Sequence, residues 1–265
     1  MSRELDCMRI VSLVPSITET LFALGLDSKQ IVGRTPWCIH PAKGVESIEV
    51  VGGTKTPNIN KIGRLSPDLI ILDKEENPKE FYDELKERGY KTFVSTVHSP
   101  TEVPEFLRKL GVATGRKQNG ESLALECEMA INDCKNTSAK LNVLPMIWHK
   151  PLMAVSPRRY AGALLELVGF KVPDIEPNGN GYPVVKNSHV LEHEVDGLLL
   201  SSEPHEFAEK EGQALIAEIF STTGIKIWYE MINGEHLTWF GSRTSFAIRE
   251  LKTYCDELKD KHALA

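Results

Sequence analysis

The feature that most constrains the fold is the alternation of short apolar runs with longer amphipathic stretches. Ile10–Val14, Leu69–Leu72 and Gly197–Ser201 are apolar runs of strand length, and each is followed by a stretch in which apolar residues recur at helical spacing. Such a rhythm is typical of βαβ units, in which the strands are parallel and the helices cover the sheet. The sequence therefore predicts an α/β protein with parallel-type central sheets.

One long stretch interrupts this rhythm and divides the chain. Asn119–Lys140 has no strand signal, and its apolar residues recur at roughly helical spacing among polar ones. A chain of 265 residues is long for one domain and sufficient for two. We therefore expect an N-terminal α/β lobe over 8–116, a connecting helix over 117–140 and a C-terminal α/β lobe over 141–261.

Composition and motifs exclude several classes of function. The net charge of −6 argues against a nucleic-acid partner, and no run of about 18 apolar residues predicts a membrane span. The chain has no GxGxxG, GxxxxGK[ST] or GxSxG motif, so dinucleotide binding, NTP binding and hydrolase chemistry lack support. The five cysteines form no CxxC pair, and their wide spacing favours reduced thiols over a disulfide framework.

The N-terminal residues carry no secretory pattern. Met1–Met8 leads directly into the first predicted strand, with no apolar stretch of 7–15 residues followed by a small-residue cleavage site. This favours a cytoplasmic protein, with a periplasmic or cell-surface location as the alternative if the sequence was trimmed.

Ligands of parallel α/β sheets gather at the carboxyl ends of the strands. The residues that follow the predicted strands include three of the four tryptophans, which supply large apolar surfaces for a ligand wall. No catalytic residue and no metal ligand is predicted. The predicted ligand-binding set is Ser16, Trp37, Cys38, Lys55, Glu75, His98, Trp148, Trp239 and Arg243.

Two alternatives concern metal ions. Cys38 and His40 stand two residues apart and can meet one ion, but a buried cysteine beside a turn-capping histidine is the favoured interpretation. His98, His149 and His205 also follow strands and, with His40, are candidates for a site that binds a free transition metal. Their wide separation in the chain argues against this second alternative.

A third alternative concerns the acidic residues after Leu72. Glu75 and Glu76 beside Lys74 can act as an acid/base group, or they can form the charged first turn of a helix, where carboxylates favour the helix dipole. The helical interpretation is favoured.

Several motifs in fixed order resemble one family. Arg9–Gly25, Val51–Thr54 and Ser66–Ile71 are similar to segments of the substrate-binding proteins that serve ABC importers of cobalamin, haem and ferric siderophores. The resemblance is good over the first lobe and looser over the second. It implies the class III periplasmic binding protein fold, in which one long helix joins two lobes, and it is strongest for the cobalamin-binding branch.

The resemblance also implies an aromatic ligand site. Trp239 stands where the cobalamin-binding branch has a tryptophan in the turn before the last helix, and Trp37 stands where an aromatic follows the second strand. The chain departs from the pattern at Lys74 and Glu75, where the family has a tryptophan.

These features imply a solute-binding protein rather than an enzyme. It would capture a metal chelate, foremost a corrinoid such as cobalamin, between its lobes and deliver it to an ABC permease. We expect a monomer that has no covalently bound cofactor and no nucleic-acid partner. The alternatives are a cytoplasmic tetrapyrrole metal chelatase using His98, Glu75 and Glu76, or a cytoplasmic corrinoid or metal carrier.

Overall fold

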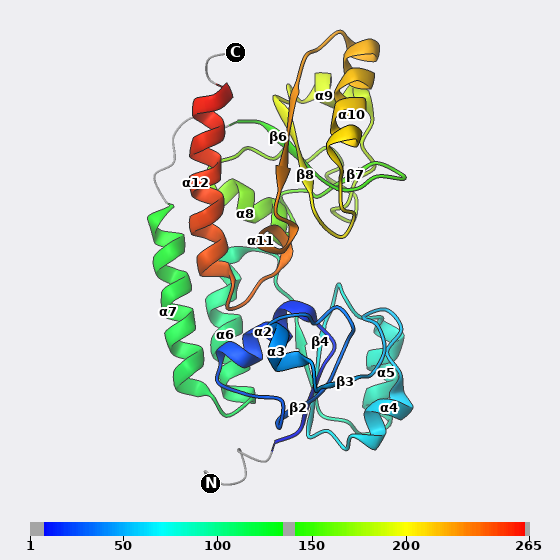
Figure 1. The fold of residues 1–265 in the computed structure, drawn as a ribbon, viewed down its shortest axis with the longest axis vertical. Helices are drawn as coiled ribbons and strands as arrows, with labels where there is room; N and C mark the ends of the chain where they lie inside the picture. The colour runs from blue at the N-terminus through cyan, green and yellow to red at the C-terminus, as the bar shows by residue number, and fades with distance from the viewer. Residues whose placement is uncertain (1–7, 135–140, 263–265) are drawn as a thin grey trace. The chain divides into compact units, whose positions relative to one another are not determined.

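The computed structural model describes residues 8–134 and 141–262, which fold into two compact units. The first unit contains residues 8–97, 102–127 and 240–243. The second contains residues 98–101, the described part of 128–239, and 244–262. Both units are built of strands and helices, so the predicted α/β class is confirmed (Figure 1).

The first unit has a wholly parallel sheet in the order β3-β2-β1-β4-β5 (Figure 1). The central strands β1 and β4 are buried along their whole length, which explains why both are continuous apolar runs in the sequence. The strands are β1 (Ile10–Ser12), β2 (Ile31–Arg34), β3 (Glu49–Val50), β4 (Leu69–Asp73) and β5 (Thr92–Ser95).

Helices follow the strands of this unit and cover the sheet. Ile62 of α4 and Phe81 and Leu85 of α5 pack on Val11 and Ile70 of the sheet in one core cluster. The helices are α2 (Pro15–Ala23), α3 (Ala42–Val45), α4 (Ile59–Arg64), α5 (Lys79–Glu87), α6 (Val103–Ala113) and the start of α7 (Lys117–Asp133), with a short 3-10 turn η1 (Pro100–Glu102) before α6.

The second unit has a mixed sheet in the order β7-β6-β8-β9. Strands β6 (Val143–Trp148), β8 (Gly197–Ser201) and β9 (Trp228–Ile232) are parallel, whereas β7 (Met153–Ala154) runs antiparallel to β6. The prediction of parallel strands is therefore confirmed for β6, β8 and β9 and is wrong for β7. A strand of two residues is too short to show a periodic pattern.

The helices of the second unit also pack on its sheet. Val190 of α9 and Leu215 and Ile219 of α10 share a core cluster with Leu144 and Leu198 of the sheet. The helices are α8 (Tyr160–Val168), α9 (Asn187–Glu192), α10 (Glu209–Thr223), α11 (Gly234–Thr238) and α12 (Thr244–His262).

The predicted connecting helix corresponds to α7. It begins at Lys117, as expected, and ends at Asp133, while residues 135–140 of the predicted segment lie outside the described residues. Residues up to Cys127 belong to the first unit and the rest of α7 to the second. The division of the chain at 116 and 140 therefore stays a prediction.

Two glycines allow α6 and α7 to approach closely. A Cβ at Gly120 would lie 2.7 Å from the Leu107 carbonyl oxygen, and one at Gly111 would lie 3.0 Å from the Gly120 Cα. An ion pair between Arg108 Nε and Glu121 Oε2 at 2.9 Å also joins the two helices.

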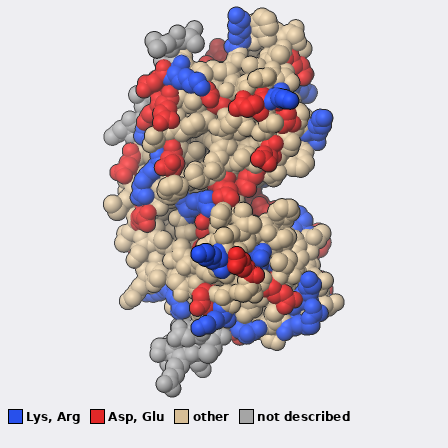
Figure 2. All heavy atoms as spheres, viewed as in Figure 1, with Lys and Arg blue, Asp and Glu red and all other residues tan. Residues whose placement is uncertain are grey.

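The described surface has mixed charge. Figure 2 shows acidic and basic side chains interspersed on the face drawn there, which therefore offers no broad basic area to a polyanion. In the part of the chain that the structure describes, no helix is both long and apolar enough to cross a membrane.

Candidate functional site

The predicted ligand residues that follow the strands of the first unit differ in how exposed they are. Ser16 lies in the first turn of α2 and is buried, whereas Trp37, after β2, is 64% exposed. Lys55 follows β3 and donates from Nζ to the backbone oxygen of Glu75 at 2.5 Å. The loops after β3 and β4 are therefore joined, and Lys55 and Glu75 are brought together.

Cys38 is placed differently from the prediction. Its side chain is fully buried, and its sulfur lies 3.1 Å from Thr18 Oγ1 and 3.2 Å from Thr35 Oγ1. Burial raises the pKa of the Cys38 thiol, although hydrogen bonds from Thr18 and Thr35 lower it in part. Direct contact with a ligand is therefore not supported, and the interpretation of Cys38 as a buried structural thiol fits this geometry.

Asp73 at the end of β4 organises the loop that carries Glu75. Its Oδ1 accepts hydrogen bonds from the backbone N–H groups of Glu75 at 2.8 Å and Glu76 at 3.2 Å, while Oδ2 accepts one from Ser95 Oγ at 2.6 Å. Asn77 Oδ1 in turn accepts from the Asp73 N–H at 2.9 Å. Sequence reasoning gave Asp73 no role, although an aspartate between an apolar strand and a turn is a signal for such a loop.

This loop also corrects the interpretation of the two glutamates. Glu75 and Glu76 lie in the turn between β4 and α5, not in the first turn of a helix, because α5 begins only at Lys79. Burial raises the pKa of Asp73, and the hydrogen bond from Ser95 lowers it in part.

Arg243 lies in the first unit and is engaged there by Glu19 of α2. Its Nε and Nη2 donate to the two Glu19 carboxylate oxygens at 2.9 and 2.7 Å, a bidentate ion pair that is largely buried. The neighbouring Ser242 N–H donates to Thr20 Oγ1 at 3.0 Å. Gly241 has a φ of +118°, and a Cβ there would collide with the Thr20 side chain. These contacts hold the segment 240–243 against α2.

The strand ends of the second unit place two of the predicted tryptophans. Trp148 ends β6, is partly exposed and donates from Nε1 to the Lys150 carbonyl oxygen at 3.1 Å. Trp239 follows α11 and is only 8% exposed. His98 lies in the segment 98–101 of this unit and is half-buried.

Two histidines of the second unit meet around one carboxylate. His149 Nδ1 lies 2.6 Å from Glu211 Oε1, and His205 Nε2 lies 3.2 Å from the same oxygen. The ring of Trp148 packs edge-on against His205 with centroids 6.1 Å apart. The sequence suggested the two histidines as metal ligands but not Glu211. Among the described residues, His149, His205 and Glu211 form the group that could hold an ion, and His40 and His98 are not part of it.

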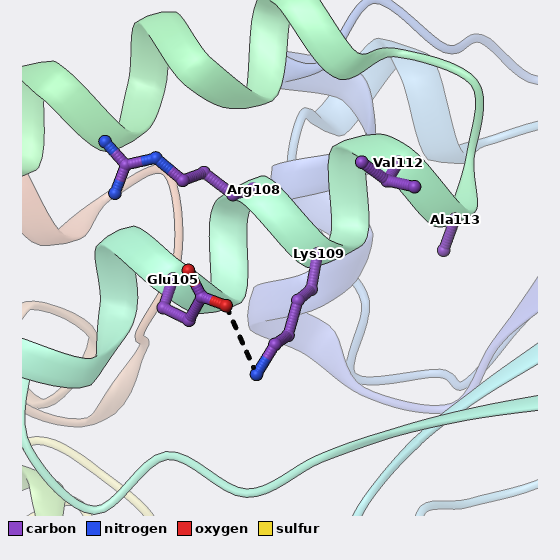
Figure 3. Close-up of a pocket in the computed structure, with 5 residues that line it drawn as sticks. All are labelled: Glu105, Arg108, Lys109, Val112 and Ala113. Carbon is purple, nitrogen blue, oxygen red and sulfur yellow. Dashed lines mark ion pairs between the residues drawn. The ribbon is translucent and has the colours of Figure 1, made fainter.

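A shallow hollow on the first unit does not match the expected ligand. It lies along α6 and is lined by Glu105, Arg108, Lys109, Val112 and Ala113 (Figure 3). Glu105 and Lys109, one turn apart on α6, form an ion pair at 3.4 Å, which Figure 3 marks with a dashed line. It offers no aromatic surface and lies on a helix rather than at the end of the strands, so we assign it no binding role.

The fold is that of the two-lobed α/β class, with a parallel or mostly parallel sheet in each unit. A family model described as "Periplasmic binding protein" matches residues 10–226. The chain belongs to this family.

Individual relatives agree with this membership. A vitamin B12-binding protein of Vibrio cholerae is 25% identical over 250 residues, covering 93% of this chain and 88% of that protein. Among solved structures, the periplasmic vitamin B12-binding protein BtuF of Vibrio cholerae is similar with a TM-score of 0.77 at 23% identity, covering 95% of this chain and 97% of that one. The apo heme-binding protein RhuT from Roseiflexus has the same TM-score at 19% identity, covering 94% and 98%.

These comparisons confirm one expectation and overturn another. The chain is a substrate-binding protein rather than an enzyme, and nothing supports the chelatase alternative. The expectation of a cytoplasmic protein is wrong, because the matched family and its similar structures are periplasmic. That expectation depended on the first residues of the sequence, from which no location follows.

Proposed function

We propose that this chain captures a metal chelate, foremost a corrinoid such as cobalamin, and delivers it to an ABC permease. The observation that carries this proposal is the match to a vitamin B12-binding protein along 93% of the chain. A corrinoid is also the ligand implied by the motifs of the first unit. Similarity to a heme-binding protein at the same TM-score makes haem the second candidate.

The proposed ligand contacts begin with the exposed tryptophans. Trp37 and Trp148 present large accessible ring surfaces at strand ends, one in each unit. A wide flat ligand with an apolar rim needs such surfaces, because they gain contact area at little cost in side-chain entropy. We include Trp239 as a third aromatic contact because of the family resemblance, although most of this residue is already buried.

Polar groups would hold the edge of the ligand. Lys55, whose Nζ donates to the Glu75 backbone oxygen, and Glu75 stand in neighbouring loops after β3 and β4, and their side chains can donate to and accept from the amides of a corrin. Arg243, whose Nε and Nη2 pair with Glu19, completes the proposed set together with His98 and Ser16. Cys38 is left out because its side chain is fully buried and its sulfur contacts Thr18 and Thr35.

Spectral and calorimetric titration tests the proposal. The purified chain is mixed in turn with cobalamin, cobinamide, haemin and a ferric siderophore, and the visible spectrum and heat are recorded. We expect one-to-one binding with the tightest affinity for a corrinoid. Tighter binding of haemin would assign the site to haem instead, and no heat or thermal shift with any of the four would refute a metal-chelate ligand.

We also propose that the protein works outside the cytoplasmic membrane, as its family membership supports. Fractionation of cells that express the native gene from its own promoter, followed by detection with an antibody, tests this. Recovery with the periplasmic or surface-anchored fraction is expected. Recovery with the soluble cytoplasmic fraction would contradict the proposal.

A further inference from the structure

A second group of ligating side chains lies wholly within the second unit. His149 follows β6, His205 follows β8, and Glu211 stands in the first turn of α10. The nearest ligand atoms of the three residues all lie within 4.8 Å of one another. Each side chain is between a quarter and a third exposed, so an ion can reach the group from solvent.

The positions of the donor atoms suit a metal ion. Both imidazoles approach the same oxygen, Glu211 Oε1, at 2.6 and 3.2 Å. Ligands of a tetrahedral zinc ion, with bonds of about 2.0–2.1 Å, stand about 3.3 Å from each other. The shorter of the two separations would have to open by less than about 1 Å, and the two imidazole nitrogens, which lie within 4.8 Å of each other, would have to take up the same spacing. An ion would then fit among the three atoms, with a fourth position left for water or another ligand.

Neighbouring groups already hold these side chains in place. The second carboxylate oxygen of Glu211, Oε2, accepts a hydrogen bond from the Ala208 N–H at 2.8 Å, which orients the carboxylate and leaves Oε1 for an ion. The ring of Phe207 packs edge-on against His205 with centroids 4.6 Å apart. Such outer contacts orient metal ligands in proteins and strengthen binding.

We propose that His149, His205 and Glu211 form a site for a free divalent transition-metal ion such as Zn²⁺. Two imidazoles and one carboxylate suit zinc, cobalt, nickel and copper, whereas magnesium and calcium prefer sets made entirely of oxygen. All three residues belong to one unit and the ion needs no tetrapyrrole, although Trp148 of the proposed chelate contacts packs against His205. The site gives the protein a second class of ligand.

Calorimetry with ZnCl₂ tests the site on the full chain, purified without a histidine tag. We expect one equivalent of Zn²⁺ to bind, and His149→Ala, His205→Ala and Glu211→Gln each to weaken binding by at least about a hundredfold, more than the loss of an outer-shell partner. Glu211→Gln is the most informative change, because the amide oxygen can still accept the Ala208 N–H and maintain the start of α10.

A matched control distinguishes this site from the remaining histidines. His189 and His193 stand one turn apart at α9 with ring centroids 6.4 Å apart, a pair that can collect ions without a carboxylate. The double variant His189→Ala/His193→Ala should bind Zn²⁺ as tightly as the native chain. Loss of binding in this variant, with the three site variants unaffected, would overturn the proposal.

Cobalt supplies an independent measurement. Co²⁺ bound by two imidazoles, a carboxylate and water should give the visible absorption of a four- or five-coordinate ion, and Zn²⁺ should displace it. If the alanine variants fail to fold, the test is Zn²⁺ binding by Glu211→Gln, provided that its melting temperature equals that of the native chain. No Zn²⁺ binding by the native chain, or equal binding of Mg²⁺ and Zn²⁺, would also refute the site.

Discussion

Replacing Trp37 with alanine is the sharpest test of the proposed ligand contacts. The Trp37 side chain is 64% exposed, so of the up to about 250 Å² that a tryptophan can bury, roughly 150 Å² remains available to a ligand. If a ligand covers half of that area, the lost contact is worth about 2 kcal/mol at 25 cal/mol per Å², or about thirtyfold in affinity. Because the side chain contacts solvent, the stability of the fold should change by less than about 0.5 kcal/mol.

The assay measures two quantities on each variant, the dissociation constant for the tightest chelate and the melting temperature. Trp37→Ala should weaken binding while the melting temperature stays unchanged. Trp239→Ala is the contrasting case, because this side chain is 8% exposed and its loss should cost about 3 kcal/mol of stability. Phe220→Ala, which removes an exposed aromatic from the last turn of α10, should change neither quantity.

One result would refute the reasoning. If the native chain binds a chelate and Trp37→Ala binds it equally well, the strand ends of the first unit do not provide an aromatic wall. A fall in affinity together with an equal fall in melting temperature would point instead to a structural role, which the exposure of the ring argues against.

Three further predictions concern stability. Burial raises the pKa of Asp73, so the folded protein is destabilised above that raised pKa, where Asp73 is ionised; Asp73→Asn should therefore be the more stable chain at pH 7. Urea unfolding should show that the difference in stability vanishes as the pH falls towards 3.8, and a difference that stays constant with pH would contradict this. Gly197→Ala should lose about 1–3 kcal/mol, because a Cβ there collides with the Trp228 ring, and chemical denaturation should show a smaller loss when Trp228→Leu is also present. Glu19→Gln should cost about 1–2 kcal/mol by removing the charge from its largely buried ion pair with Arg243, and thermal unfolding of Glu19→Gln/Arg243→Met should show less than the sum of the single losses.

Much of the fold could be predicted from the sequence because the central strands are buried on both faces. β1 and β4 are continuous apolar runs for that reason, and each is followed by a helix that begins near a proline. β7 could not be predicted, because a strand of two residues, Met153–Ala154, is too short to show a periodic pattern even though it pairs directly with β6. The end of a long helix is equally hard to place when no glycine or proline marks it.

The candidate site could be predicted only in part, because chain order tells which residues follow a strand but not which way they face. Trp37 and Cys38 are adjacent in sequence, yet one is exposed and the other fully buried. Glu211 was missed because its role depends on α10 turning back towards the loops after β6 and β8, where the two histidines lie. A carboxylate in the first turn of a helix is common because it interacts favourably with the helix dipole, so its position in the sequence does not indicate that it also contacts histidines.

The choice of ligand depends on the loops rather than on the strands. Proteins named for vitamin B12 and for heme match this fold with the same TM-score of 0.77, so the arrangement of strands and helices does not distinguish the two. What differs must lie in the side chains that the strand ends present. In this chain the loop after β4 presents Glu75 where the resembled family has an aromatic, and Lys55 is bonded to the backbone of that same residue. An ammonium and a carboxylate in neighbouring loops suit a ligand edge that both accepts and donates hydrogen bonds, as the amides of a corrin do, whereas Glu75 would repel the carboxylates of haem. These two residues therefore support our proposal of a corrinoid rather than haem with a chemical argument that does not depend on overall similarity.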